Sequence, residues 1–319
     1  MANPLARNAA LLDPRKFRDP LITAAGDRRA RVTLRSLDTL WFNTGTLCNL
    51  TCANCYIESS PRNDQLVYLS AAEVALYLNE ISNDGLSTRL IGFTGGEPFM
   101  NPDLPEMLDA VLSRGLRALV LTNAMRPMAK CRPALLRLRQ AYGDRLTIRV
   151  SLDHYANAVH EAERGRRSWR PTVDGLVWLS ENGVSVAVAT RYLSGEPEAE
   201  IRRGFARLFA TLGLTLDADD PTALVIFPEM DATADVPEIT EACWDILNKS
   251  PDSVMCGSSR MVVKRKGAAH PTVVACTLLP DDPQFDLGPS LAGASGAVPL
   301  NHPHCARFCV LGGAACSRD

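Results

Sequence analysis

The sequence lacks long apolar runs, a marked net charge and an export signal. No apolar run reaches the roughly 18 residues that a membrane span needs, and charged residues interrupt the first 35 positions, where a secretory signal would be apolar. Lys and Arg total 34 and Asp and Glu total 36, so 34 minus 36 gives a formal charge of −2. This balance argues against nucleic acid or an anionic membrane as a partner. We therefore expect a cytoplasmic protein.

Aromatic residues are also few, at 6% of 319 residues, but 46% hydrophobic and 22% charged residues are values typical of a globular chain. The length predicts two domains or one large barrel with appendages. Ten cysteines without an export signal indicate a reducing compartment, where cysteines serve metal sites or chemistry more often than disulfides.

Short apolar runs alternate with amphipathic runs from about residue 39 to about residue 247, which predicts βα units around a parallel sheet. Ser70 and Glu73 form a capping box ahead of one such helix. Further helices are predicted at 132–142, 198–212 and 239–247. The six predicted strands cover residues 40–44, 89–93, 118–122, 146–153, 184–192 and 223–227.

Three cysteines, Cys48, Cys52 and Cys55, stand in the run CNLTCANC directly after the first predicted strand. Three thiolates on one loop can each bind a different iron of a four-iron cluster, which leaves the fourth iron open to a small molecule. A structural zinc site completed by a distant Cys or His is the alternative.

The second predicted strand runs into the turn Thr94–Gly95–Gly96–Glu97–Pro98. Glycines let a backbone approach a ligand closely, and a carboxylate can accept hydrogen bonds from an ammonium group. In a parallel α/β fold this turn lies beside the cysteine loop, at the carboxyl ends of the strands, where such folds assemble their sites.

A C-x3-C-x2-C loop after strand one and a GGE turn after strand two closely resemble the pattern of the radical S-adenosylmethionine (SAM) enzymes, over roughly residues 38 to 230. The resemblance implies an α/β fold, a partial (β/α)6 TIM-like barrel, with a 4Fe-4S cluster whose open iron binds SAM. It also implies reductive cleavage of SAM to a 5′-deoxyadenosyl radical, with electrons from a flavodoxin or ferredoxin-type donor.

The resemblance assigns site residues position by position. Cys48, Cys52 and Cys55 match the catalytic cluster ligands. Asn123 and Arg191 end two strands near the cofactor, and Arg191 could pair with the SAM carboxylate or form an ordinary ion pair. The remaining cofactor-binding positions are Tyr56 beside the adenine, Gly95, Gly96 and Glu97 at the methionyl ammonium, and Ser151 and Asp153 at the ribose.

Other assignments also have structural alternatives. Tyr56 could be a core aromatic residue, and Ser151 and Asp153 could cap a strand end. His154 stands where the peptide- and small-molecule-modifying branch of the family usually has glycine, so we expect it to reshape the substrate side of the site. The basic run from Arg164 to Arg170 could bind a substrate or form a solvated helix entrance.

Beyond about residue 250 the sequence becomes rich in Cys, Gly, Pro and Ser, with a predicted hairpin of residues 261–264 and 272–276. This segment is similar to shortened auxiliary-cluster extensions called SPASM and twitch domains. One auxiliary 4Fe-4S cluster with four of the five cysteines is the preferred interpretation, and zinc with His270, His302 or His304 is the alternative. The five cysteines are Cys256, Cys276, Cys305, Cys309 and Cys316.

The expected organisation is an N-terminal extension at 1–37, a radical SAM partial barrel at 38–249 and a cysteine-rich auxiliary-cluster domain at 250–319. The leading hypothesis is modification of an unactivated carbon in a ribosomal peptide or small natural-product precursor. About 40 residues before the first strand are too few for a leader-peptide domain, so a peptide would need a partner protein or direct capture. A small-molecule or cofactor-biosynthesis enzyme and a non-catalytic iron-sulfur or zinc sensor are the alternatives.

Overall fold

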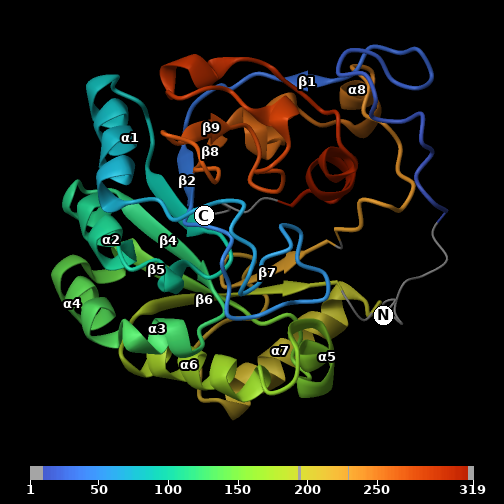
Figure 1. Ribbon diagram of the computed structural model, residues 1–319. Helices are drawn as coiled ribbons and strands as arrows, with labels where there is room; N and C mark the ends of the chain where they lie inside the picture. The colour runs from blue at the N-terminus through green and yellow to red at the C-terminus, as the bar shows by residue number, and fades with distance from the viewer. Residues whose placement is uncertain (1–9, 193–194, 229, 315–319) are drawn as a thin grey trace.

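The computed structural model describes residues 10–192, 195–228 and 230–314. Its main feature is one curved eight-stranded sheet in the order β7-β6-β5-β4-β3-β2-β8-β9 (Figure 1). Strands β2 to β7 pair in parallel, which confirms the predicted partial (β/α)6 barrel. The strands are β2 (Thr39–Asn43), β3 (Leu90–Thr94), β4 (Arg117–Thr122), β5 (Leu146–Ser151), β6 (Ser185–Arg191), β7 (Leu224–Phe227), β8 (Ser259–Val263) and β9 (Thr272–Val274).

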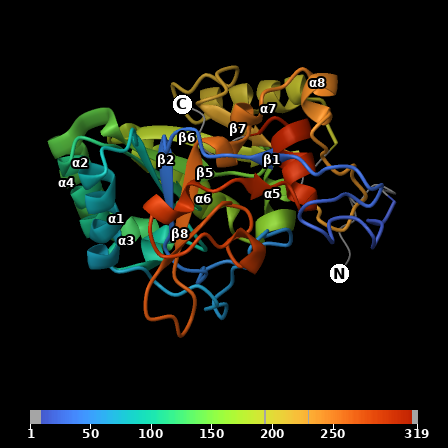
Figure 2. The same cartoon turned by 90° about the horizontal axis from the view of Figure 1, so that it is seen from above.

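Helices cover the outer face of this sheet, as Figures 1 and 2 show. The first of them begins at the predicted capping box, where the Ser70 hydroxyl accepts a hydrogen bond from the Glu73 N–H. The helices on this face are α1 (Ala71–Asn83), α2 (Leu104–Ser113), α3 (Arg126–Lys130), α4 (Arg132–Tyr142), α5 (Asn157–Arg164), α6 (Trp169–Glu181) and α7 (Glu198–Thr211). The short helix α8 (Cys243–Leu247) lies apart from them and packs against the N-terminal segment.

The helix predicted at 239–247 is shorter than expected and begins only at Cys243. Residues 239 and 240 pair instead with the N-terminal segment: Ala30 N–H donates to the Ile239 carbonyl, and Thr240 forms a bridge with Arg29. Backbone groups engaged in this pairing hold the chain extended, so tertiary contacts override the helical periodicity here.

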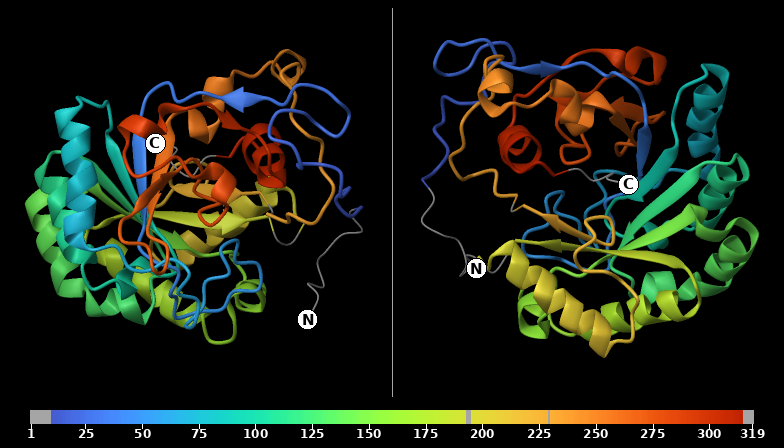
Figure 3. Two further views of the ribbon diagram at one scale, coloured as in Figure 1. Left: turned by 45° about the horizontal axis from the view of Figure 1, so that its top comes forward. Right: turned by 180° about the vertical axis from the view of Figure 1, so that it is seen from behind.

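The C-terminal part lies beside the barrel (Figure 3) and is joined to it by the pairing of strands β2 and β8. The predicted hairpin forms as β8 and β9, and β8 pairs in parallel with β2, so the hairpin extends the barrel sheet. A two-stranded pairing of β1 (Arg31–Val32) with β10 (Val298–Pro299) and a π-helix, η7 (Cys305–Leu311), complete this part. Cys316 lies outside the described residues.

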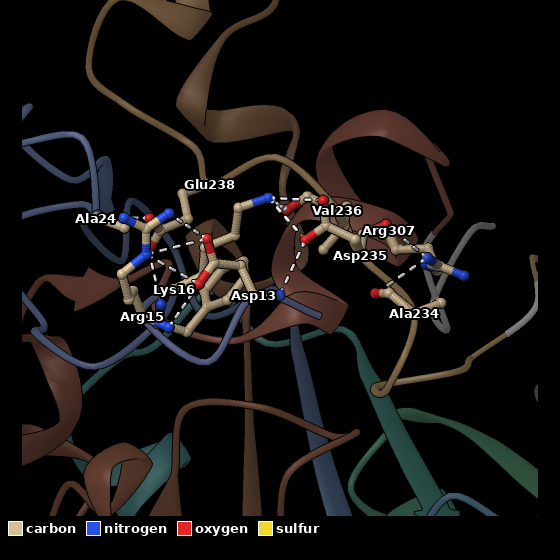
Figure 4. A network of polar contacts seen from close by, with 10 residues as sticks. Asp13, Arg15, Lys16, Ala24, Ala234, Asp235, Val236, Glu238 and Arg307 are labelled. Atoms are coloured by element: carbon tan, nitrogen blue, oxygen red, sulfur yellow. Dashed lines mark hydrogen bonds and ion pairs between the residues drawn. The ribbon is translucent and has the colours of Figure 1, made fainter. Parts of the chain in front are cut away.

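The N-terminal segment lies against the C-terminal part (Figure 4). Lys16 pairs with Asp235 at 2.7 Å, and Glu238 accepts hydrogen bonds from the backbone N–H groups of Phe17 and Ala24. Glu238 also pairs at 2.5 Å with Arg29, whose side chain is fully buried. Within the described ranges, every helix is too short or too polar to cross a membrane.

Candidate functional site

A cavity opens at the carboxyl ends of the barrel strands. It brings together all but one of the cofactor and cluster residues that the sequence predicted around the barrel. The predicted residues that line it are Cys48, Cys52, Cys55, Tyr56, Gly95, Gly96, Asn123, Ser151, Asp153 and Arg191. Because these residues come from loops and strand ends far apart in the sequence, their convergence is a property of the fold.

Glu97 is the predicted residue that does not line the cavity. Its carboxylate is 1% exposed and accepts hydrogen bonds from the Phe99 N–H, the Thr122 hydroxyl and the Asn123 N–H, at 3.1, 2.7 and 2.9 Å. Burial raises the pKa of Glu97, and these hydrogen bonds oppose that rise. In this arrangement the Glu97 carboxylate connects the glycine turn to the end of β4 by hydrogen bonds. A contact between Glu97 and the methionyl ammonium of SAM stays a prediction.

The two glycines of the turn allow it to pack against the segment that enters the cysteine loop. Gly95 has a φ of +142°, and a Cβ there would lie 2.5 Å from the Gly45 carbonyl oxygen. A Cβ on Gly96 would lie 2.3 Å from the Leu47 carbonyl oxygen. Gly96 N–H in turn donates to the Gly45 carbonyl at 2.8 Å, so any side chain here would separate the two loops.

The cysteine loop is held by the last turn of α5. The Glu163 carboxylate accepts hydrogen bonds from the backbone N–H and the side-chain amide of Asn54, which lies between Cys52 and Cys55. Arg191 completes this clamp, since it donates to the Asn54 carbonyl at 2.9 Å and pairs with Glu163. Arg191 is therefore already in an ion pair, and it also lines the cavity.

A buried cation that the sequence did not single out lies in the same cavity. Arg164 pairs with Asp153 at 2.7 Å, and its side chain is 14% exposed, against 84% for Arg170 of the same basic run. Burial alone would raise the pKa of Asp153, but the guanidinium groups of Arg164 and Arg191 hold it at about 2. Arg164 therefore differs from Arg170 of the same basic run in its exposed fraction, a difference that the sequence does not show.

His154 is not among the residues that line the cavity. Its ring accepts a hydrogen bond from the Ala156 N–H and bonds to Glu196 at 3.0 Å, and an effect on the substrate side stays a prediction. Burial raises the pKa of Cys48 to about 12, so in the metal-free protein this thiol is protonated.

A second, mostly apolar cavity lies in the C-terminal part. It collects the four described C-terminal cysteines, Cys256, Cys276, Cys305 and Cys309, together with His304. Neither His270 nor His302 lines it. The other lining residues are Val254, Met255, Ala275, Leu278, Phe285, Val298 and Leu300.

Two observations test whether these cavities suit a metal cluster. Across the residues described, no group of three or more His, Cys, Asp or Glu side chains is placed to hold a single metal ion. A four-iron cluster needs no such convergence, because each thiolate binds a different iron. In the second cavity Nδ1 of His304 is buried with no hydrogen-bond partner, as expected of a group that faces an additional ligand. The thiols of both cavities are therefore compatible with a four-iron cluster, and zinc stays the alternative for the C-terminal site.

One aromatic pair lies between the two thiol sites. Phe227 at the end of β7 lines the barrel cavity, and its ring stacks on Phe308 at 5.6 Å between centroids. Phe308 lies on η7 between Cys305 and Cys309. This stacked pair forms part of an apolar cluster that links the two sites and includes Tyr56, Met230, Cys276 and Cys309.

A partial parallel barrel that gathers three loop cysteines and a glycine turn at its strand ends belongs to the class of α/β barrels built around a metal cluster. The Radical SAM superfamily model matches residues 42–206, about half of the chain. The chain therefore belongs to the radical SAM superfamily, and this membership implies a 4Fe-4S cluster and SAM as cofactors.

Individual relatives agree with this assignment. The antilisterial bacteriocin subtilosin biosynthesis protein AlbA of Bacillus subtilis is 35% identical over 44% of this chain and 30% of its own length. The mycofactocin maturase MftC of Mycolicibacterium smegmatis is 25% identical over 69% of this chain and 54% of its own length. This chain thus spans about a third to a half of these relatives.

Solved structures show the same fold. Streptococcus suis SuiB bound to S-adenosylmethionine aligns with a TM-score of 0.58 and 13% identity, over 79% of this chain and 63% of SuiB. SuiB bound to its precursor peptide SuiA aligns with a TM-score of 0.60, also at 13% identity, over 83% of this chain and 66% of SuiB.

Proposed function

We propose that this protein is a radical SAM enzyme that modifies a peptide. The convergence of Cys48, Cys52 and Cys55 with the glycine turn and the strand-end polar residues in one cavity carries this proposal. A 4Fe-4S cluster held by these cysteines, with SAM on its open iron, supplies reductive cleavage of the sulfonium and a 5′-deoxyadenosyl radical that removes a hydrogen atom from the substrate.

The chain's own residues bind and orient the cofactor. Ser151 and Asp153 offer a hydroxyl and a carboxylate to a ribose diol. Arg164, paired with Asp153, and Arg191, paired with Glu163, are the two guanidinium groups that line the cavity, and either can offer an N–H donor to the SAM carboxylate. Arg191 also fixes the cysteine loop through the Asn54 carbonyl.

Apolar residues complete the cavity and exclude water. Leu121, Phe227 and Met230 line it alongside Tyr56. Exclusion of water protects a reactive radical from side reactions and fixes the direction in which it attacks. Tyr56, next to the third cysteine, is placed to border the adenine.

A peptide substrate is favoured over a small molecule because of the relatives. The name of AlbA describes a bacteriocin biosynthesis protein, and SuiB has been solved with a precursor peptide. The substrate is tested by anaerobic incubation of the reconstituted enzyme with peptides encoded beside its gene. Mass loss corresponding to removed hydrogen atoms supports the proposal, whereas turnover only with small metabolites contradicts it.

We assign the second cavity to one auxiliary 4Fe-4S cluster with Cys256, Cys276, Cys305 and Cys309 as ligands. Thiolates in an apolar enclosure of this kind suit an iron-sulfur cluster. It also holds together a part of the chain with little regular secondary structure, as metal sites do in small domains.

Cofactor cleavage provides the direct test of the enzyme. Protein reconstituted with iron and sulfide is reduced with dithionite, in place of a flavodoxin or ferredoxin-type donor, and given SAM. We expect 5′-deoxyadenosine, and none above background from the variant with Cys48, Cys52 and Cys55 all changed to Ala. No difference between the two proteins would exclude the enzyme and favour a non-catalytic metalloprotein. Iron retained by the triple variant measures the auxiliary cluster separately.

A further inference from the structure

His304 is a buried histidine in the cysteine-lined cavity, and its Nδ1 atom has no hydrogen-bonding partner. The residue is 6% exposed, lies next to Cys305 and lines the cavity, and its Nδ1 atom is fully buried with no partner. An unsatisfied buried polar atom destabilises the folded chain, and native structures contain few of them. The imidazole is therefore expected to have a partner in the working protein.

The backbone fixes His304 in this position. Its N–H donates to Nδ1 of His302 at 3.1 Å, and the next residue, Cys305, donates its N–H to the His302 carbonyl at 2.9 Å. His304 thus directly precedes η7, the π-helix that carries both Cys305 and Cys309. These bonds hold the backbone of His304 at the start of that helix, beside the cavity that its side chain lines.

The cavity itself offers few alternatives as a partner. Among its described lining residues there is no carboxylate, and apart from the four cysteines and His304 all of them are apolar. The sulfur atoms of a cluster in this cavity are the acceptors that the ring could reach.

We propose that the His304 imidazole donates an N–H···S hydrogen bond to the auxiliary cluster and so raises its reduction potential. This inference rests on the auxiliary cluster of the proposed function. A hydrogen bond to a cluster sulfur stabilises the more negative, reduced state, which makes the cluster easier to reduce. His304 is then a positioning residue that sets how readily the auxiliary cluster accepts an electron.

The experiment isolates the auxiliary cluster in the full-length chain. In the variant with Cys48, Cys52 and Cys55 changed to Ala, only this cluster can be titrated by redox potentiometry and electron paramagnetic resonance. His304→Phe removes the donor and keeps a ring of similar size, and His304→Asn restores an N–H donor near Nδ1. His270→Phe makes the same replacement at an exposed histidine and serves as the control.

We expect His304→Phe to shift the midpoint potential to a more negative value at unchanged iron content, His304→Asn to recover part of the shift, and His270→Phe to have no effect. An unchanged potential in His304→Phe would overturn the inference. So would a strong nitrogen hyperfine coupling, which would make His304 a direct ligand. If His304→Phe fails to bind iron, the midpoint potential of His304→Asn is compared with those of the parent and of the apolar variant His304→Leu. A value closer to the parent than to His304→Leu supports the inference, and a value equal to that of His304→Leu overturns it. A triple variant without iron would instead refute the auxiliary cluster itself.

Discussion

Glu163 accepts two hydrogen bonds from Asn54, one from its backbone N–H at 2.9 Å and one from its side-chain amide at 2.8 Å. The two residues are 109 positions apart in the sequence. Glu163 also accepts from Arg191, and its carbonyl accepts from the Ala53 N–H at 2.8 Å. The end of α5 therefore determines the conformation of the loop that carries the cluster ligands.

We expect Glu163→Ala to destabilise the metal-free protein by about 2 kcal/mol, because it removes the acceptor of both part-buried Asn54 donors and one ion-pair partner of Arg191. The loop should also lose its preorganisation, so less iron should bind on reconstitution. Urea unfolding and iron analysis measure the two effects. The control, Glu181→Ala, removes an exposed carboxylate at the end of α6 and should change neither. Equal iron binding by the two variants would contradict the conclusion that Glu163 holds the cysteine loop in its binding conformation.

Gly96→Ala should separate the glycine turn from the cysteine loop. Its Cβ would lie 2.3 Å from the Leu47 carbonyl oxygen, a backbone atom that can move only with its loop. Overpacking of this kind costs about 1–3 kcal/mol, and SAM binding should weaken as the cavity distorts. Gly296→Ala is the matched control, because nothing lies within 4 Å of a Cβ there and its φ is −56°. Similar stabilities for the two variants would argue against this packing.

Patterns that are local in the sequence predicted the fold well. The six apolar runs became β2 to β7, and the Ser70 capping box starts α1 as predicted. Both depend on neighbouring residues, which is why periodicity and spacing suffice for them. The cysteine loop and the glycine turn were found in the same way, since each lies within a short stretch of chain.

Features that depend on distant contacts were missed. Arg164 looked like the other arginines of its run, and only the burial of the end of α5 distinguishes it. Glu97 carries the family pattern, yet its oxygens are engaged by Thr122 and Asn123 of the neighbouring strand end. The shortened α8 results from pairing with Arg29, more than 200 residues earlier. The spacing of residues along the sequence does not predict such distant partners.

Acid should destabilise the metal-free protein through Asp153. Its pKa is about 2 in the folded chain, against 3.8 for an aspartic acid carboxyl group that is free in solution. A carboxyl whose pKa is lowered by folding contributes stability that is fully present above about pH 4 and is lost as the pH falls to about 2. The shift corresponds to about 2 kcal/mol of unfolding free energy.

Urea unfolding of the metal-free protein between pH 5 and about pH 2 should show this loss. Asp153→Asn should be less stable at neutral pH, because Arg164 is then left without its buried partner. It should also show a smaller decrease toward low pH than the parent chain. Parallel pH profiles for the two proteins would rule out Asp153 as the source of the acid sensitivity.

The two ion pairs that attach the N-terminal segment should differ sharply in strength. Arg29 and Glu238 have side chains 0% and 5% exposed, whereas Lys16 and Asp235 are 22% and 36% exposed. Removing one partner of a buried pair costs about 3–5 kcal/mol, but an exposed pair contributes about 0–1 kcal/mol. Arg29→Met should therefore destabilise the protein far more than Lys16→Met.

Arg29 also donates to the carbonyl of Leu300, which lines the second cysteine cavity. Arg29→Met should therefore lower the amount of iron bound at the auxiliary site, while the barrel cluster still cleaves SAM. Equal losses from both clusters would indicate general unfolding, and no loss from either would show that the N-terminal segment does not support the auxiliary site.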